Sequence, residues 1–157
     1  MVAMHVAPRL VALVRHGKAE SGEEGSDHAR RLTSKGRSDA VATGQWLAGR
    51  LDRVDLVWVS SARRAKETWT ALSGALPAAG EVLVERELYQ AGAREVLDRV
   101  ARTDVPVMVV VGHNPTLEHA VLALTGSLHG LRPGSAAIIE RDADGGGSLV
   151  ELWTPPR

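Results

Sequence analysis

Three short clusters, each directly after an apolar run, supply between them two histidines, three arginines and two glycines. The three clusters are Arg15-His16-Gly17, Ser60-Ser61-Ala62-Arg63-Arg64 and Gly112-His113-Asn114-Pro115. Arginine offers a planar fork of donors that matches pairs of phosphate oxygens, and it stays charged. Imidazole can act near neutral pH as a nucleophile, a donor or a general base. Since phosphoryl transfer depends mainly on positioning and charge stabilisation, these residue types indicate phosphoryl chemistry that needs no metal.

The shared position of the clusters matters more than any one of them. A lone histidine is more often structural than catalytic, and we expect no catalytic role for His5, His28, His119 and His129. In an open α/β sheet, however, ligands bind beyond the carboxyl ends of the strands. If the apolar runs are strands of one sheet, the three clusters converge on one edge. There Gly17 and Gly112 would let the backbone approach a ligand closely.

Apolar runs alternate with amphipathic stretches along most of the 157 residues. The spacing of apolar residues predicts strands over residues 10–14, 56–59, 82–84, 105–111, 137–140 and 149–153. It predicts helices over residues 33–51, 62–72, 93–101 and 116–124. This alternation predicts an α/β fold with three α/β/α layers, a largely parallel central sheet and an antiparallel edge. We expect a single domain over residues 1–157.

Two segments are rich in turn-forming residues. Residues 142–147, DADGGG, are expected to join the last two strands into a hairpin. Their D-x-D-G pattern is related to one used by aspartyl phosphatases, but two charged residues separate it from the strand and glycines follow, so we favour a turn. Residues 21–26, SGEEGS, predict a mobile surface loop.

Composition narrows the class of protein. Cysteine is absent, which excludes disulfides, thiolate metal sites and cysteine-dependent phosphatases. The formal net charge is zero and no basic block stands out, so we expect no nucleic-acid partner. Apolar runs are too short for a membrane span or a signal peptide, and we expect a cytoplasmic protein. No cofactor or metal is expected.

The motifs resemble those of the histidine phosphatase superfamily, which has the phosphoglycerate mutase-like fold. LVRHGKAE is similar to its leading RHG motif, and VVGHNPTLEHAV is similar to its second-histidine motif. SSARRAKETW is similar to S-P-x-x-R-A-x-Q-T, with Ser61 in place of Pro and Glu67 in place of Gln, which makes Arg64 the motif arginine. DHARRLTSKGRSDA is similar to D-x-x-R-P-L-T-x-x-G, with Arg31 in place of Pro. The small size and residues 88–91, LYQA, are most similar to the short branch named for the phosphohistidine phosphatase SixA.

The resemblance covers residues 10–153 and implies a role for each matched residue. His16 would attack phosphorus and become transiently phosphorylated. Arg15, Arg64 and His113 would surround the phosphoryl oxygens. To attack, His16 must present an unprotonated nitrogen, so its other nitrogen should donate to a backbone carbonyl, such as that of Gly17.

Five further residues in these motifs are candidates for binding the substrate: Gly17, Lys18, Arg30, Gly112 and Asn114. Lys18 has an alternative interpretation as a solvated surface residue. Arg30 has an alternative interpretation as the partner of Asp27 at the start of a helix.

The general acid is the weakest part of the resemblance. Larger members of the superfamily use a carboxylate to protonate the leaving oxygen, because an alkoxide leaves poorly. Glu87 is the nearest candidate by position, and Glu20 and Glu118 are weaker candidates. If no acid is present, the substrate should carry a good leaving group, and phosphohistidine on a protein fits because its P–N bond is labile.

Two other functions stay open. A small-molecule phosphomonoesterase would act on a sugar or nucleotide phosphate, but this chain has little room for the insertions that build extra substrate pockets. A phosphate-binding module without turnover would not need the complete set of Arg15, His16, Arg64 and His113. A phosphorylated protein is therefore the expected partner, and a small phosphorylated metabolite is the alternative.

Overall fold

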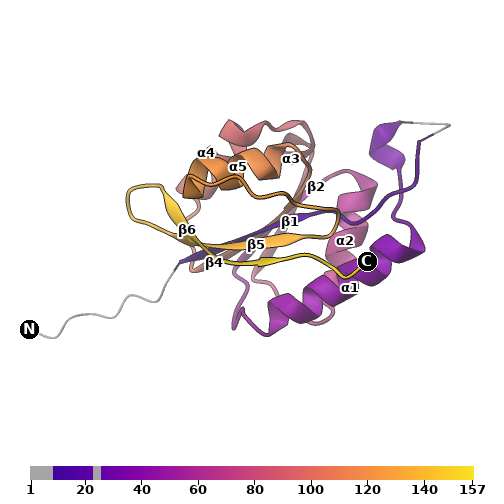
Figure 1. Ribbon diagram of the computed structural model, residues 1–157, viewed down its shortest axis with the longest axis horizontal. Coiled ribbons are helices and arrows are strands. Elements are labelled where there is room, and N and C mark those ends of the chain that lie inside the picture. Colours follow the sequence, from indigo (N-terminus) through magenta and orange to yellow (C-terminus); the bar gives the residue numbers. More distant parts are fainter. Residues whose placement is uncertain (1–8, 23–25) are drawn as a thin grey trace, which may run out of the picture.

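A computed structural model describes residues 9–22 and 26–157 as a central sheet covered by helices on both faces (Figure 1). The strands are β1 (Leu10–Arg15), β2 (Leu56–Ser60), β3 (Glu81–Glu85), β4 (Val107–Gly112), β5 (Ala136–Arg141) and β6 (Gly147–Trp153). The helices are η1 (Asp27–Ala29), α1 (Ser34–Ala48), α2 (Arg63–Ser73), α3 (Arg86–Gln90), α4 (Ala93–Arg102) and α5 (Thr116–Thr125). In the described part of the chain, no helix is long and apolar enough to cross a membrane.

The six strands form one sheet in the order β3-β2-β4-β1-β5-β6. The first four strands of the chain pair in parallel, while β5 runs antiparallel to β1 and β6 antiparallel to β5. In Figure 1, α3, α4 and α5 lie over one face of the sheet, and α1 and α2 lie over the other. The structure confirms the predicted three-layer α/β fold with a largely parallel sheet and an antiparallel edge.

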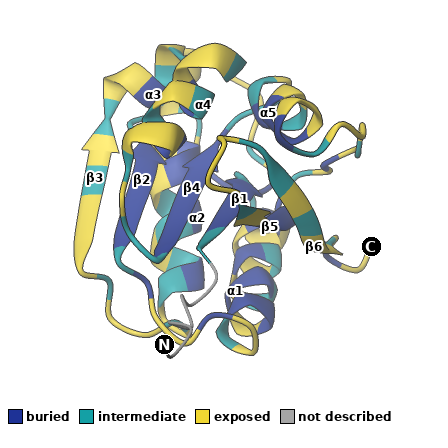
Figure 2. Ribbon diagram, turned by 90° about the vertical axis from the view of Figure 1, so that its left-hand side faces the viewer, coloured by how far each residue is buried: buried dark blue, intermediate teal, exposed yellow. Residues whose placement is uncertain are grey.

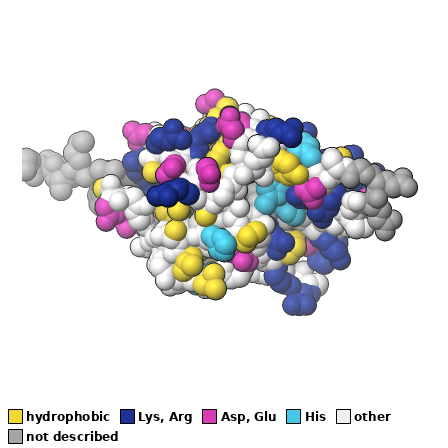
Figure 3. All heavy atoms as spheres, turned by 90° about the horizontal axis from the view of Figure 1, so that it is seen from above, with side chains coloured by type: hydrophobic (Ala, Val, Ile, Leu, Met, Phe, Trp, Pro, Cys, Tyr) yellow, Lys and Arg dark blue, Asp and Glu magenta, His cyan; other side chains and the backbone are white. Residues whose placement is uncertain are grey.

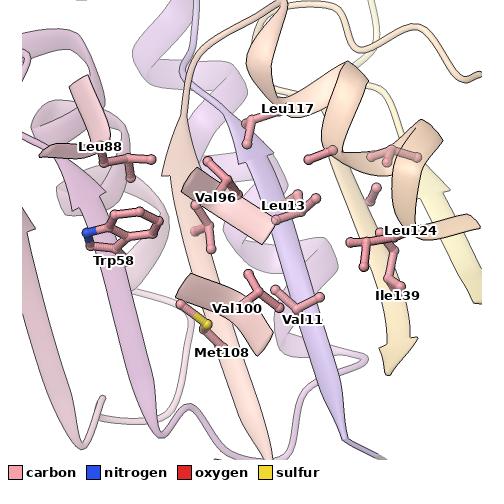
Figure 4. Close-up of a cluster of buried hydrophobic side chains, with 14 of the residues drawn as sticks. Val11, Leu13, Trp58, Leu88, Val96, Val100, Met108, Leu117, Leu124 and Ile139 are labelled. Atoms are coloured by element: carbon pink, nitrogen blue, oxygen red, sulfur yellow. The ribbon is translucent and has the colours of Figure 1, made fainter. Parts of the chain in front are cut away.

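The core consists of two layers of mainly aliphatic side chains, one on each face of the sheet. Every residue of β4 is buried, as expected for a Val-rich strand between parallel neighbours. Figure 4 shows the layer beneath α3, α4 and α5, where Trp58, Leu88 and Leu117 pack over the strands. In Figure 2 the exposed surface includes most of the edge strand β3, which pairs on one side only. This packing holds the carboxyl ends of β1, β2 and β4 in fixed register.

The elements match the predicted ones within a few residues, with two additions. α1 begins after Thr33, whose hydroxyl accepts a hydrogen bond from Gly36 N at 3.0 Å, and it ends before residues 49–51, which form a turn. The short helices η1 and α3 were not predicted. The last two strands form the expected hairpin, in which Asp142 N donates to Gly146 O. Part of the predicted loop over residues 21–26, namely 23–25, lies outside the described residues.

Candidate active site

The three clusters meet where β1, β4 and β2, adjacent in the sheet, end. Arg15 is the last residue of β1 and pairs with Gly112 of β4, and His16 N donates to Gly112 O at 3.0 Å. His113 follows directly, and the ring centroids of His16 and His113 lie 5.2 Å apart. Arg64 reaches the same place from the first turn of α2, which follows β2. Figure 3 shows histidine side chains at the surface of this face of the molecule, with Lys and Arg side chains close to some of them.

His16 is held in the tautomer that a nucleophile needs. Its Nδ1 lies 2.7 Å from the carbonyl oxygen of Gly17. A carbonyl can only accept, so Nδ1 carries the proton and Nε2 carries the lone pair. Nε2 faces the Nε–H of Arg64, which donates to it at 3.3 Å. The predicted bond to the Gly17 carbonyl is confirmed, and it leaves Nε2 free of a proton.

Arg64 is the most enclosed charge of the site, with only 6% of its surface exposed. One side of its guanidinium faces the two histidines, through Nε to His16 Nε2 and Nη2 to His113 Nδ1, both at 3.3 Å. Thr68, one turn further along α2, accepts from Gly17 N at 3.0 Å and donates to the carbonyl of Arg64 at 2.8 Å. The threonine of the R-A-x-x-T motif therefore ties α2 to the loop that follows β1.

His113 is oriented by a hydroxyl on the neighbouring strand. Its Nε2 lies 2.7 Å from Ser60 Oγ, which also accepts from Ala62 N at 3.2 Å. Since Arg64 Nη2 donates to Nδ1, the neutral ring carries its proton on Nε2 and donates it to Ser60. The Nδ1 edge of His113 therefore faces the same space as His16 Nε2, where a phosphoryl oxygen would lie.

Arg15 is held in place by a hydrogen bond to the segment that precedes β5. Its Nη1 donates to the carbonyl of Leu131 at 2.8 Å. The side-chain amide of Asn114 donates to the same carbonyl and to Glu118 Oε1, each at 2.8 Å, and Glu118 Oε1 also accepts from Leu131 N at 2.8 Å. Burial lowers the pKa of Arg15, and the nearby Glu118 charge opposes that effect. Asn114 and Glu118 thus hold the backbone that aims Arg15.

Both histidines are neutral at physiological pH. Burial is the largest cause that lowers the pKa of His16, to about 3; the Gly17 hydrogen bond opposes it, and electrostatic repulsion between a protonated His16 and His113, Arg64 and Arg15 lowers the pKa further. Burial and the Arg64 charge lower the pKa of His113 to about 4. The His16 imidazole beside two guanidinium groups therefore stays unprotonated well below its ordinary titration range.

These low pKa values predict a loss of stability in acid. Below the ordinary histidine pKa of 6.5, the unfolded rings bind protons that the folded rings exclude. The free energy of unfolding should therefore fall as the pH drops from 6.5 toward 4, by about 1.4 kcal/mol per pH unit for each ring. Urea titrations between pH 7 and pH 4 measure this slope. The double variant His16→Asn, His113→Asn should show a shallower slope, and an equal slope would contradict the assignment.

The two glycines of the site differ in what requires them. A Cβ on Gly17 would lie 2.7 Å from the carbonyl oxygen of Gly36 in α1, so this position needs glycine for close packing of the chain. A Cβ on Gly112 would meet Leu117 and Leu88 at 3.7 Å, an ordinary contact. Both are buried, and their expected contact with substrate stays a prediction.

Two other predicted substrate-binding residues, Arg30 and Lys18, have their contacts away from His16 and His113. Arg30 donates from Nη1 to Asp27 Oδ1 at 2.8 Å and from Nε to the carbonyl of Glu20 at 2.7 Å, so its alternative role as a partner of Asp27 is confirmed. Lys18 is exposed and lines a hollow of about 260 Å³ together with Arg132 and other residues. Contact of either side chain with substrate stays a prediction.

The three carboxylates considered as acids lie in different places. Glu87 is exposed in the first turn of α3 and lines a hollow with Trp58 and Arg99. This hollow is not lined by any of Arg15, His16, Arg64 and His113. Glu20 pairs with Arg31 at 2.9 Å on the surface. Glu118 holds Leu131 N and the Asn114 amide. None of these contacts places a carboxylic acid on the two histidines.

Sequence reasoning missed the residues that come from η1 and α3. Asp27 Oδ2 accepts from Arg64 Nη2 at 3.0 Å and from the hydroxyl of Tyr89 at 2.8 Å. The Tyr89 ring stands edge-on to His113, with centroids 5.7 Å apart. Asp27 is the first residue of the D-x-x-R pattern, which was the available signal, whereas Tyr89 stood out only as part of the LYQA segment, to which no role was given. Among the described residues, no group of three or more His, Cys, Asp or Glu side chains has the arrangement of a metal site.

Comparison with known proteins agrees with this geometry. The family model of the histidine phosphatase superfamily (branch 1) matches residues 11–91. Protein ML1117 of Mycobacterium leprae is 34% identical over 104 residues, 65% of this chain and 62% of that protein. Protein Rv1276c of Mycobacterium tuberculosis is 34% identical over 130 residues, 82% of this chain and 77% of that protein.

Among solved structures, a candidate phosphohistidine phosphatase SixA from Nakamurella multipartitia matches with a TM-score of 0.85 and 31% identity, covering 97% of this chain and 99% of that one. The match extends from β1 to the terminal hairpin, well beyond the segment that the family model covers. The chain therefore belongs to the histidine phosphatase superfamily, branch 1, whose members are phosphatases, and it has the fold of SixA.

Proposed function

We propose that the chain removes phosphate from phosphohistidine on a protein, without a metal ion, through a phosphorylated His16. The observation that carries the proposal is the neutral His16 ring, whose Nε2 lone pair faces Arg64 and His113 while the Gly17 carbonyl holds the Nδ1 proton. A nucleophile, two guanidinium groups and a fixed tautomer are the parts that phosphoryl transfer to histidine requires.

In the first step, His16 Nε2 attacks phosphorus while the P–N bond to the substrate ring breaks. The electron pair of that bond goes to the substrate nitrogen. A substrate ring protonated at its second nitrogen leaves as neutral imidazole and takes no proton from the enzyme. Arg64 and Arg15 stabilise the charge on the equatorial phosphoryl oxygens, which is where electrostatic preorganisation is most effective.

The second step returns His16 to its starting state. The Gly17 carbonyl keeps the proton on Nδ1, so the phosphorylated ring is cationic and departs from phosphorus as neutral imidazole. The oxygen of water forms the new bond to phosphorus, and a water proton passes to a phosphate oxygen or to solvent. Inorganic phosphate leaves, and the Nε2 lone pair is restored.

The placement of the carboxylates supports phosphohistidine over an alkyl ester. Within residues 9–22 and 26–157, no carboxylic acid is hydrogen-bonded to His16, and the carboxylate that pairs with Arg64 is that of Asp27. Hydrogen bonds from Arg30, Tyr89 and Arg64 hold the pKa of Asp27 well below its usual range, so it is ionised and has no proton to give. An alkoxide leaving group would need such a proton, whereas imidazole does not.

Phosphate release in excess EDTA tests the proposal, with a phosphohistidine-bearing carrier protein and p-nitrophenyl phosphate as substrates. We expect release that EDTA does not reduce, and a kcat/KM at least about tenfold higher for phosphohistidine, a difference of about 1.4 kcal/mol in transition-state stabilisation. Activity that disappears in EDTA and returns with Mg²⁺ would contradict metal independence. Faster turnover of sugar phosphates would favour a small-molecule phosphatase, and binding without any turnover would favour a phosphate-binding module.

A further inference from the structure

We propose that Asp27 is the positioning residue of the phosphate-binding arginine, and that it sets the plane of Arg64 by occupying one edge of its guanidinium. The inference rests on the proposed function, because it assigns Arg64 the role of holding the phosphoryl group. Nothing in the motif resemblance gives Asp27 such a role.

The contacts of Asp27 with Arg64 form a two-point grip. The main-chain carbonyl of Asp27 accepts from Arg64 Nη1 at 2.8 Å, and Asp27 Oδ2 accepts from Arg64 Nη2 at 3.0 Å. Nη1 and Nη2 together form the end edge of the planar guanidinium, so two acceptors from one residue fix both its direction and its plane. A single turn of 3₁₀ helix, η1, supplies both acceptors.

The contacts with Asp27 occupy the end edge of Arg64 and leave its side edge available to a phosphoryl group. Nε and the second N–H of Nη2 form the side edge, and these two donors point at His16 Nε2 and His113 Nδ1, each at 3.3 Å. A phosphoryl group bonded to His16 would place its oxygens against this side edge. Asp27 and the phosphoryl group therefore use different edges of one guanidinium, and they need not compete.

Asp27 is itself held in place by two side chains that are not hydrogen-bonded to His16. Tyr89 of α3 donates its hydroxyl to Oδ2 at 2.8 Å, and Arg30 donates to Oδ1 at 2.8 Å. These bonds keep the pKa of the carboxyl well below its usual range. The Asp27 side chain is half exposed, yet all of its hydrogen bonds point inward to the site or along η1. Rigid support of this kind is what a residue needs to orient another side chain.

A different role for Asp27 makes the opposite prediction. If its carboxylate stood in the place of a phosphoryl oxygen, an incoming anion would have to displace it, and its removal would tighten anion binding. Loss of a nearby negative charge would also, by simple electrostatics, tighten anion binding. Weaker anion binding after removal of Asp27 is therefore a specific sign that Arg64 has lost its orientation.

The test is a double-mutant cycle on tungstate binding, measured by isothermal titration calorimetry. The four proteins are the wild type, Asp27→Ala, Arg64→Lys and the double variant. We expect Asp27→Ala to weaken tungstate binding about 10- to 100-fold, the range found when a residue that orients a ligating side chain is removed. In the Arg64→Lys background the same change should cost less than about twofold, because lysine has no guanidinium edge to orient.

Controls separate orientation from damage to the fold. Asp98→Asn changes an exposed carboxylate of α4 that makes no hydrogen bond or ion pair within the described residues, and it should bind tungstate like the wild type. If Asp27→Ala fails to fold, Asp27→Leu replaces it in the cycle, since leucine keeps a similar size and has no acceptor for Arg64 Nη2. Tyr89→Phe should show a smaller loss than Asp27→Ala, because both contacts between Asp27 and Arg64 remain.

Two results would overturn the inference: tighter tungstate binding in Asp27→Ala, or an equal loss in the wild-type and Arg64→Lys backgrounds. Tungstate binding needs no turnover, so the cycle reads the role of Asp27 even if the chain does not hydrolyse phosphohistidine. A cycle with the expected coupling and no phosphate release from phosphohistidine would uphold the positioning role and refute the proposed function.

Discussion

Replacing His16 with alanine is expected to abolish phosphate release, with a loss of about 10⁴-fold or more in kcat, as is usual when a covalent nucleophile is removed. The remaining guanidinium groups, those of Arg15 and Arg64, would still bind the phosphoryl oxygens. The variant should therefore keep its affinity for substrate within about tenfold while it loses turnover, because binding and nucleophilic attack are carried by different atoms.

A trapping experiment separates this expectation from a general defect. Wild-type enzyme quenched during turnover of labelled substrate should carry acid-labile phosphate, as a P–N bond does, and His16→Ala should carry none. His119→Ala changes an exposed histidine of α5 and should leave both turnover and labelling unchanged. A labelled His16→Ala protein would mean that another residue is the nucleophile.

The positions of the candidate catalytic residues could be predicted because strand ends determine where they lie. The Val-rich run of β4 and the apolar run of β1 identify neighbouring buried strands, and parallel strands bring their carboxyl ends to one edge. His16 and His113 follow those ends, so their proximity is a consequence of the sheet. Even the tautomer of His16 was predictable, because its own neighbour Gly17 supplies the carbonyl.

The support around these residues could not be predicted, because it depends on short elements and main-chain atoms. η1 has three residues and α3 has five, too few for an apolar periodicity to appear. α3 is held in place by the burial of Leu88, which is 2% exposed, and this fixes Tyr89 above Asp27. Tertiary packing sets these conformations, and no local pattern encodes them.

The carbonyl oxygen that accepts a hydrogen bond from Arg15 could not be predicted from the sequence either. It belongs to Leu131, which lies 116 positions further along the chain. A main-chain acceptor has no residue type, so the sequence carries no signal for it. Glu118 could be noticed as a charged residue near a motif, but its use as a support for Leu131 N follows only from the fold.

In the SSARRAKETW motif, the sequence predicts the phosphate-binding role for Arg64 and not for its neighbour Arg63. This choice between adjacent arginines can be tested by substitution. Arg64→Lys should reduce kcat about 100- to 1000-fold, the usual cost of losing an aligned donor to the transition-state oxygens. Lysine keeps the charge but cannot present the side edge that faces His16 and His113. Steady-state kinetics with p-nitrophenyl phosphate measure the loss.

Arg63→Lys is the matched control, since Arg63 is exposed and pairs with Glu67 at 3.3 Å on the outer side of α2. It should change kcat by less than about twofold, because surface ion pairs contribute little. A larger loss for Arg63→Lys than for Arg64→Lys would mean that the motif is shifted by one residue. Equal and small losses would mean that charge alone, without the forked geometry of Arg64, is enough to hold the phosphoryl group.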